Sequence, residues 1–145
     1  MANVVPNAFK GELLSGTHNF ASGGDSFKLA LYTANPYTTS STAYSSGAGN
    51  EVSGSAAGYS TGGSALTSQA VASSTATASV DFANLTFSSA TFSAAFGAIY
   101  NDDKSDKLVV ILDFGGTKTA TNGDFTISFP DPSTASNAII SLTSS

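Results

Sequence analysis

The sequence predicts an all-β protein: a single antiparallel β-sandwich, jelly-roll-like or Greek-key, with one short N-terminal helix. Three observations predict it. Apolar and polar residues alternate in several short segments, as in half-buried strands. Turn-forming residues separate these segments about every 8–12 residues, a spacing typical of sandwiches and barrels. The 145-residue chain is also rich in threonine and has ten phenylalanines and five tyrosines, which favour ordered strands over disorder.

Residues 1–25 are expected to form an N-terminal arm that carries the helix and docks on the rest of the chain. Asn7–Ser15 has the helical pattern, because Phe9 and Leu13 lie four residues apart, and Gly16 is a natural end. A helix this short is marginal alone, so it must pack against something. Residues 26–145 are expected to form the sandwich domain.

The first strand of that domain is expected at Ser26–Thr33, where one phenylalanine and two leucines share a face. A long loop at 34–66 follows, rich in Ser, Thr and Gly. Loops of this length are usually functional or mobile. Two short edge strands are expected inside it, around Thr42–Ser45 and Tyr59–Leu66.

The second half of the chain predicts a regular series of strands. They are expected at Thr75–Phe82, Leu85–Phe87, Phe92–Tyr100, Leu108–Phe114, Asp124–Phe129 and Asn137–Leu142. Asn122–Gly123 predicts a hairpin turn from a short strand near Lys118 into the strand at Asp124, because Asn-Gly favours the tight turns of hairpins.

Charge and cysteine content exclude several classes of function. Charged residues make up 10% of the chain, the net charge is −5, and all five cations are lysines. Proteins that bind nucleic acid or anionic membranes present clustered Lys and Arg, so we expect neither partner. The chain has no cysteine, which removes disulfides and thiolate metal sites.

The candidate catalytic motifs are weak. Gly58–Gly62 reads G-x-S-x-G, the nucleophile elbow of hydrolases, but that motif needs a later histidine and the single histidine, His18, precedes Ser60. Asn101–Asp106 gathers oxygen ligands without the spacing of an EF-hand, which favours a solvated turn. We therefore expect no enzyme activity, no catalytic residue, no cofactor and no metal.

Three stretches of the sequence occur together in a recognisable order. They run from Glu51–Gly54 into Gly58–Leu66, from Ala90–Ala94 to Gly97–Asn101, and from Leu108–Gly116 to Thr121–Pro130. Over about residues 7–142 the chain resembles a family of small virion structural proteins of tailed bacteriophages. It departs from that family at Ala95–Phe96, where an arginine is expected.

The resemblance implies a structural role in the virion, after assembly in the cytoplasm of the host bacterium, and supplies no catalytic residues. The favoured role is a capsid decoration or cement protein that binds and stabilises the major capsid lattice. One alternative is a tail, collar or fibre component that contacts the host surface, and a less favoured one is a carbohydrate-binding module. The expected partners are the major capsid protein or other virion proteins, and the chain is expected to be a homo-oligomer.

Partner contacts are expected where large side chains exceed the needs of a small sandwich. Tyrosine suits such contacts because it supplies a large area at low entropic cost. The candidates lie in the N-terminal arm and in the long loop: Val4, Val5, Phe9, Leu13, Tyr37, Tyr44 and Tyr59. The alternative interpretation is that these residues cover the ends of the domain's own core.

Overall fold

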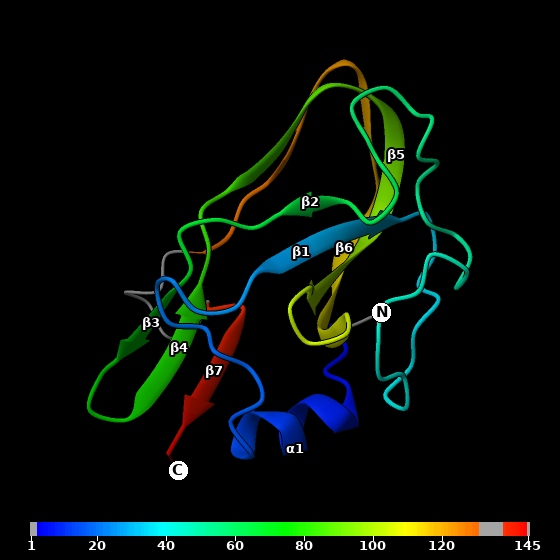
Figure 1. Cartoon of the computed structure of the whole chain (residues 1–145). Coiled ribbons are helices and arrows are strands. Elements are labelled where there is room, and N and C mark those ends of the chain that lie inside the picture. The colour runs from blue at the N-terminus through cyan, green and yellow to red at the C-terminus, as the bar shows by residue number, and fades with distance from the viewer. Residues whose placement is uncertain (1–2, 131–137, 145) are drawn as a thin grey trace.

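Two antiparallel sheets and one short helix form the fold in a computed structural model of the chain, which describes residues 3–130 and 138–144 (Figure 1). In chain order the elements are α1 (Asn7–Leu14), β1 (Phe27–Tyr32), β2 (Ser64–Ala65), β3 (Ala70–Ser73), β4 (Thr77–Asp81), β5 (Leu85–Asn101), β6 (Lys107–Ile127) and β7 (Ile140–Thr143). The predicted all-β fold with one N-terminal helix is confirmed.

The strands form a large sheet of order β2-β1-β5-β6 and a small sheet of order β3-β4-β7. Every pairing between neighbours is antiparallel. The small sheet passes into the large one through residues 82–84, and Phe82 is 1% exposed. Phe27 of β1 packs edge-on against Phe82, with ring centroids 5.7 Å apart, so one core serves both sheets.

The strands β5 and β6 form one long hairpin that bends over on itself. It pairs from Asn101 and Lys107 at one end to Leu85 and Ile127 at the other. Figure 1 shows it rising to an apex and descending toward the small sheet. The register shifts on both sides of Ala90, which is a sign of bulges, and bulges bend strands.

The hairpin predicted at Asn122–Gly123 is wrong. Gly123 pairs with Ala90 inside the long ladder, and Asn122 takes a positive φ of 48° at the bend. The same backbone freedom that suits Asn-Gly to a tight turn here serves a bulge. The chain instead reverses direction between β5 and β6 at residues 102–106, the segment expected to be a solvated turn.

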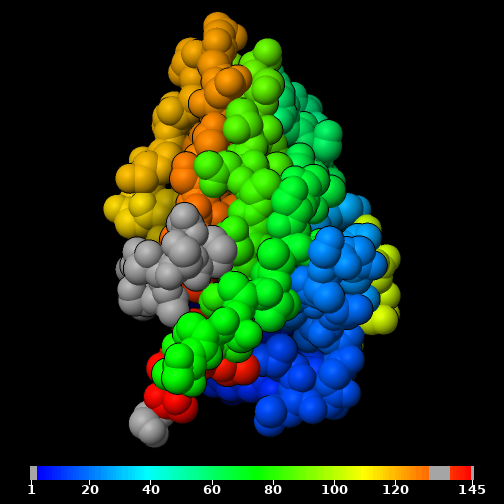
Figure 2. Space-filling view, turned by 90° about the vertical axis from the view of Figure 1, so that its left-hand side faces the viewer, coloured from blue at the N-terminus to red at the C-terminus, as the bar shows by residue number. Residues whose placement is uncertain are grey.

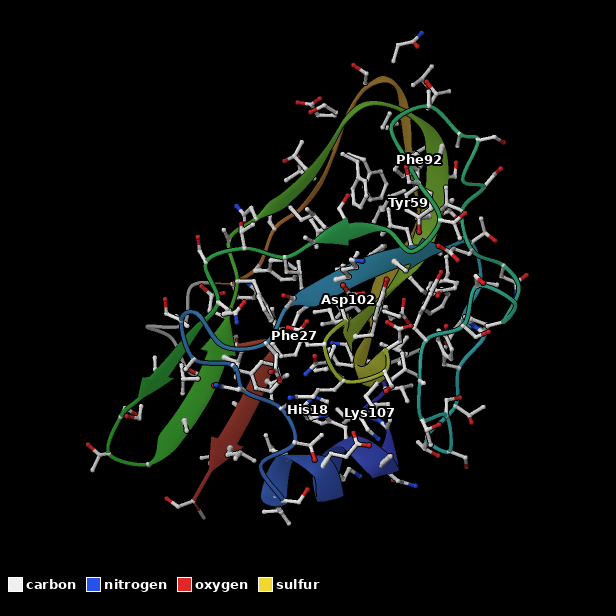
Figure 3. The ribbon with its side chains drawn as sticks, in the orientation of Figure 1. His18, Phe27, Tyr59, Phe92, Asp102 and Lys107 are labelled. Carbon is white, nitrogen blue, oxygen red and sulfur yellow. The ribbon has the colours of Figure 1, made fainter. Side chains whose placement is uncertain are left out.

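Aromatic rings fill the inside of the bend. Phe92 lies 5.0 Å from Phe125 and 6.0 Å from Phe87, measured between ring centroids. Tyr59 approaches from the long loop, 5.7 Å from Phe92 (Figure 3). The bend is therefore stabilised by a cluster that draws residues from both arms of the hairpin and from the loop.

The long loop is bound to the large sheet at several points. The Val52 amide donates to the Leu31 carbonyl at 2.9 Å, and Ala43 forms an isolated bridge with Lys107. The edge strand expected at Tyr59–Leu66 is the two-residue β2, which pairs with β1. The segment around Thr42–Ser45 makes only the single bridge.

The N-terminal residues lie along the large sheet before the helix begins. Val4 and Ile111 exchange two backbone hydrogen bonds of 2.9 and 2.8 Å. Phe9 anchors α1 to the core and is 2% exposed. Gly16 has a φ of 72°, the left-handed conformation that commonly ends helices. At the other end of the chain β7 begins at Ile140, and the expected start of that strand, Asn137, lies outside the described residues.

Candidate protein-binding site

An apolar groove lies between the helix and the edge of the small sheet. Its walls come from the N-terminal segment and from β7 with the two residues before it, and we call it the α1–β7 groove: Val5, Phe9, Lys10, Leu13, Leu14 and 138–142. Its volume is about 540 Å³. Leu14 is 89% exposed and Leu142 is 58% exposed, high values for leucine.

A second hollow of about 300 Å³ continues the groove across the small sheet. It shares Leu13, Ile140 and Leu142 with the groove and extends it to Val71. The sheet register explains this surface, because Val71, Val80 and Ile140 are paired neighbours in one row across the three strands. Figure 2 shows this end of the molecule, where β7 and the β3–β4 strands adjoin the N-terminal segment, opposite the apex of the β5–β6 hairpin.

The arm residues predicted as contacts divide between this surface and the core. Val5, at 38% exposed, and the half-buried Leu13 line the α1–β7 groove. Val4 is held in its bridge to Ile111. Phe9 is buried in the hydrophobic core, which corrects its prediction as a surface contact. Its side chain holds the N-terminal arm on the domain.

The three tyrosines predicted as contacts belong to the internal structure of the long loop. Tyr37 is 7% exposed and its hydroxyl lies 3.0 Å from that of Tyr32. Tyr59 is 5% exposed, and its hydroxyl accepts the Leu31 amide at 3.0 Å. Tyr44 is half-buried and stacks on Tyr100 at 4.4 Å. These positions correct the expectation of a tyrosine contact surface and match the alternative interpretation.

Glu51 connects these tyrosines to the loop backbone. Its carboxylate accepts the hydroxyls of Tyr44 and Tyr59 at 3.0 and 2.8 Å and the amide of Gly62 at 2.6 Å. Burial, reinforced by the nearby carboxylate, raises the pKa of both tyrosines well above the usual range. The hydroxyls therefore remain protonated donors, as a structural network requires.

His18 is part of a buried polar network between the N-terminal arm and the β5–β6 turn (Figure 3). Its Nε2 donates to the Glu12 carboxylate at 3.0 Å, and its Nδ1 accepts the Asn101 amide at 2.9 Å. This pattern assigns the proton to Nε2. Asn101 also donates to Asp25 at 2.8 Å, so the network joins two parts of the arm to the end of β5.

Two carboxylates of this network are held in their charged form. Burial would raise the pKa of Glu12, but the hydrogen bonds that it accepts from Lys107 and His18, together with the charge of Lys107, outweigh burial and lower that pKa. Burial likewise opposes ionisation of Asp25, and the Asn19 amide, the Asn101 side chain and Lys104 reverse the effect, so its pKa is lowered too. The arrangement holds the arm in place.

The G-x-S-x-G segment has a structural explanation. A Cβ on Gly58 would lie 2.7 Å from the Ser88 carbonyl oxygen, and its φ is 81°. The Gly62 carbonyl accepts the Tyr100 hydroxyl at 2.7 Å. Figure 3 shows Tyr59, the neighbour of Ser60 in the chain, far from His18, so the structure does not bring serine and histidine together.

The turn at residues 102–106 is held by its own carboxylates. Asp102 pairs with Lys28 at 3.0 Å, and Asp103 accepts the Ser26 amide at 2.6 Å. Across residues 3–130 and 138–144, no group of three or more His, Cys, Asp or Glu side chains is placed to hold a metal ion. No helix in the described part of the chain is long and apolar enough to cross a membrane.

Comparisons with protein-family models, with curated proteins and with solved structures found no match to this chain. The fold and the site therefore define the chain as an all-β, two-sheet protein with an open apolar groove between its helix and its small sheet.

Proposed function

We propose that the chain is a virion structural protein of a tailed bacteriophage, a capsid decoration or cement protein that stabilises the major capsid lattice. The α1–β7 groove serves as a contact to a neighbouring subunit in that assembly. The observation that carries the proposal is the exposure of aliphatic side chains around the groove, above all Leu14 and Leu142. The resemblance of the three sequence stretches to virion proteins supports the same role.

The energetics of the groove favour assembly. Fully burying one Val or Leu side chain is worth about 1.5–3 kcal/mol. Four exposed side chains lie at this end of the molecule: Val5, Leu14, Val71 and Leu142. Contiguous apolar surfaces on small proteins mark interaction sites, and the core of an interface is depleted in charge. In the groove, Lys10 is the one charged residue among those lining it.

The test is incorporation of variants into virions of the phage that encodes the chain. Leu142→Lys places a charge in the groove, and Thr121→Lys adds the same charge to an exposed position near the apex. We expect at least a tenfold loss of virion-bound protein for Leu142→Lys and none for Thr121→Lys, with unchanged circular dichroism for both. Equal incorporation of the two variants would contradict the groove as the contact.

Electron microscopy of the same particles tests the role itself. Many copies distributed over the capsid are expected of a decoration protein. A few copies at the tail or collar would replace it with the alternative role. Absence of the chain from purified virions would overturn the proposed function.

A further inference from the structure

We propose that the α1–β7 groove takes β7 of a second copy of this chain, so that two copies pair β7 with β7 about a twofold axis. This inference rests on the proposed function only in using the groove as a subunit contact. The two small sheets would join into one continuous antiparallel sheet of order β3-β4-β7-β7-β4-β3.

β7 lines the groove, and no other described strand than β4 pairs with it, so its second edge is unpaired within the described part of the chain. The Ser144 amide donates to the Ala76 carbonyl at 2.8 Å, which makes these residues a hydrogen-bonded pair of the ladder with β4. Hydrogen-bonded and non-hydrogen-bonded pairs alternate in an antiparallel ladder. The N–H and C=O groups of Ser141 and Thr143 therefore point away from β4, where no described strand pairs with them.

Both edge strands of the large sheet are protected from pairing with another chain. β6 is covered near its start by bridges to Ala43 and Val4, and it carries charged side chains along its length. The outer strand at the opposite edge, β2, is only two residues long. By contrast β7 has four residues, no charge, no proline and no covering segment among the described residues.

A second copy fits this edge better than a generic partner because the strand is complementary to itself. With Leu142 on the twofold axis, Ser141 of each copy exchanges both backbone hydrogen bonds with Thr143 of the other, so every outward group of these residues is satisfied. Leu142 then faces its own equivalent as a non-hydrogen-bonded pair, the closer kind. Two chains of net charge −5 repel one another, and β7 offers an uncharged place for them to meet.

The groove favours the β7 edge over the equally uncharged β3 edge. A strand added at β7 also covers Val5 and Leu14, which stand on the far wall. A strand added at β3 covers only Val71 among the large exposed apolar side chains. An added strand therefore buries more apolar area at the β7 edge than at the β3 edge, which favours pairing at β7.

A pair of proline variants tests the edge. Ser141→Pro removes an outward N–H of β7, so it blocks the added strand and leaves the bonds to β4 in place. Ser73→Pro is the matched control: by the same alternation from the Ser74–Thr77 bond, Ser73 points outward from β3. By sedimentation equilibrium we expect a dimer for wild type and Ser73→Pro, and a dissociation constant at least tenfold weaker for Ser141→Pro.

Cross-linking tests the register, since the chain has no cysteine of its own. Leu142→Cys should form a disulfide-linked dimer under mild oxidation. Val71→Cys, at a position of similar exposure (55% against 58%), should stay monomeric on a denaturing gel. A wild-type monomer at every concentration, or equal cross-linking of the two variants, would overturn the dimer. A monomer that still binds to virions would overturn the dimer and leave the proposed function standing. A dimer that is absent from virions would support the β7 pairing and overturn the proposed function.

Discussion

Gly63 lets the end of the long loop touch the first strand of the large sheet. A Cβ at this position would lie 1.8 Å from the Leu29 carbonyl oxygen, a distance that no side chain tolerates. Its φ of 75° is also in the region that disfavours every residue with a Cβ. Gly63 therefore fixes how closely the segment entering β2 approaches β1.

Replacing Gly63 by alanine should destabilise the protein more than backbone conformation alone explains. Gly23 has the same φ of 75° and nothing within 4 Å of its added Cβ, so Gly23→Ala reports the conformational cost, about 1–2 kcal/mol. Gly63→Ala adds the steric clash, worth about 1–3 kcal/mol more. Urea unfolding of both variants measures the difference. Equal free energies of unfolding would show that the loop moves aside without cost.

The sequence indicated that the loop tyrosines make important contacts, but it predicted contacts to a partner where the structure shows contacts within the chain. Tyr37 and Tyr59 lie in a Ser/Thr/Gly-rich stretch with no period, so nothing local indicates what they face. Tyr37 contacts Tyr32 and Tyr59 contacts Leu31, and both of these partners are on β1 rather than in the loop. Leu31 is also 28 residues from Tyr59 in the sequence. Contacts of that kind depend on tertiary structure. Leu14 and Leu142, in contrast, became candidates only when the fold showed them uncovered.

Among the elements, the N-terminal helix depends on charge as well as on Phe9 for its position. Lys107, at the start of β6, hydrogen-bonds to Glu12 on the helix, and Glu12 in turn accepts from His18. These contacts join a short helix to residues almost a hundred positions away. Loss of the Glu12 charge should therefore weaken the docking of the arm before it affects the sheets.

Acid should destabilise the protein through Glu12 and Asp25. Both folded-state pKa values lie below the ordinary values of 4.5 and 3.8, so near these values the unfolded chain binds more protons than the native one. The stabilisation is complete above about pH 5 and is lost as the pH falls through the folded pKa values. Urea unfolding at pH values from about 6 to about 3 should show the free energy of unfolding decline.

Glu12→Gln should lower the free energy of unfolding by about 1–3 kcal/mol at neutral pH and flatten the decline in acid. Asp124→Asn, at an exposed carboxylate of β6, serves as the control and should keep the wild-type curve. Parallel curves for wild type and Glu12→Gln would show that this ion pair does not anchor the arm.

Element boundaries divide clearly into those that local pattern determines and those that it does not. Strong alternation predicted β1 and β4, and the apolar run at Leu108 predicted the start of β6. The bend in the long hairpin was missed because Asn-Gly permits a turn and a bulge equally well, and only the partner strand decides. β3 was missed because Ala-Val-Ala-Ser has little pattern, and its pairing with β4 creates the strand.

For the whole molecule, charge and apolar surface are separated in space. The stretches from 52 to 80 and from 132 to the C-terminus contain no charged residue, and they include β3, β7 and nearly all of β4. Most charged residues lie in the N-terminal segment, the β5–β6 turn and β6; the others are Lys28 in β1, Glu51 in the long loop, Asp81 at the end of β4, and Asp131. The small sheet is therefore the part of the surface where two like-charged copies meet with least repulsion.

Self-association through the small sheet should strengthen as salt is added. The net charge of −5 on each copy opposes association, and salt shortens the screening length from about 10 Å at 0.1 M to about 3 Å at 1 M. Apolar contacts and backbone hydrogen bonds in the groove are not weakened by that screening. The dissociation constant measured by sedimentation should fall a few-fold across this range.

Asp124→Lys, which changes the net charge from −5 to −3 at a site near the apex, should give a tighter dimer at low salt and a weaker salt dependence. A dissociation constant that rises with salt would instead indicate an interface of ion pairs, such as the exposed pair of Lys28 and Asp102, and would exclude the uncharged edge of β7 as the contact.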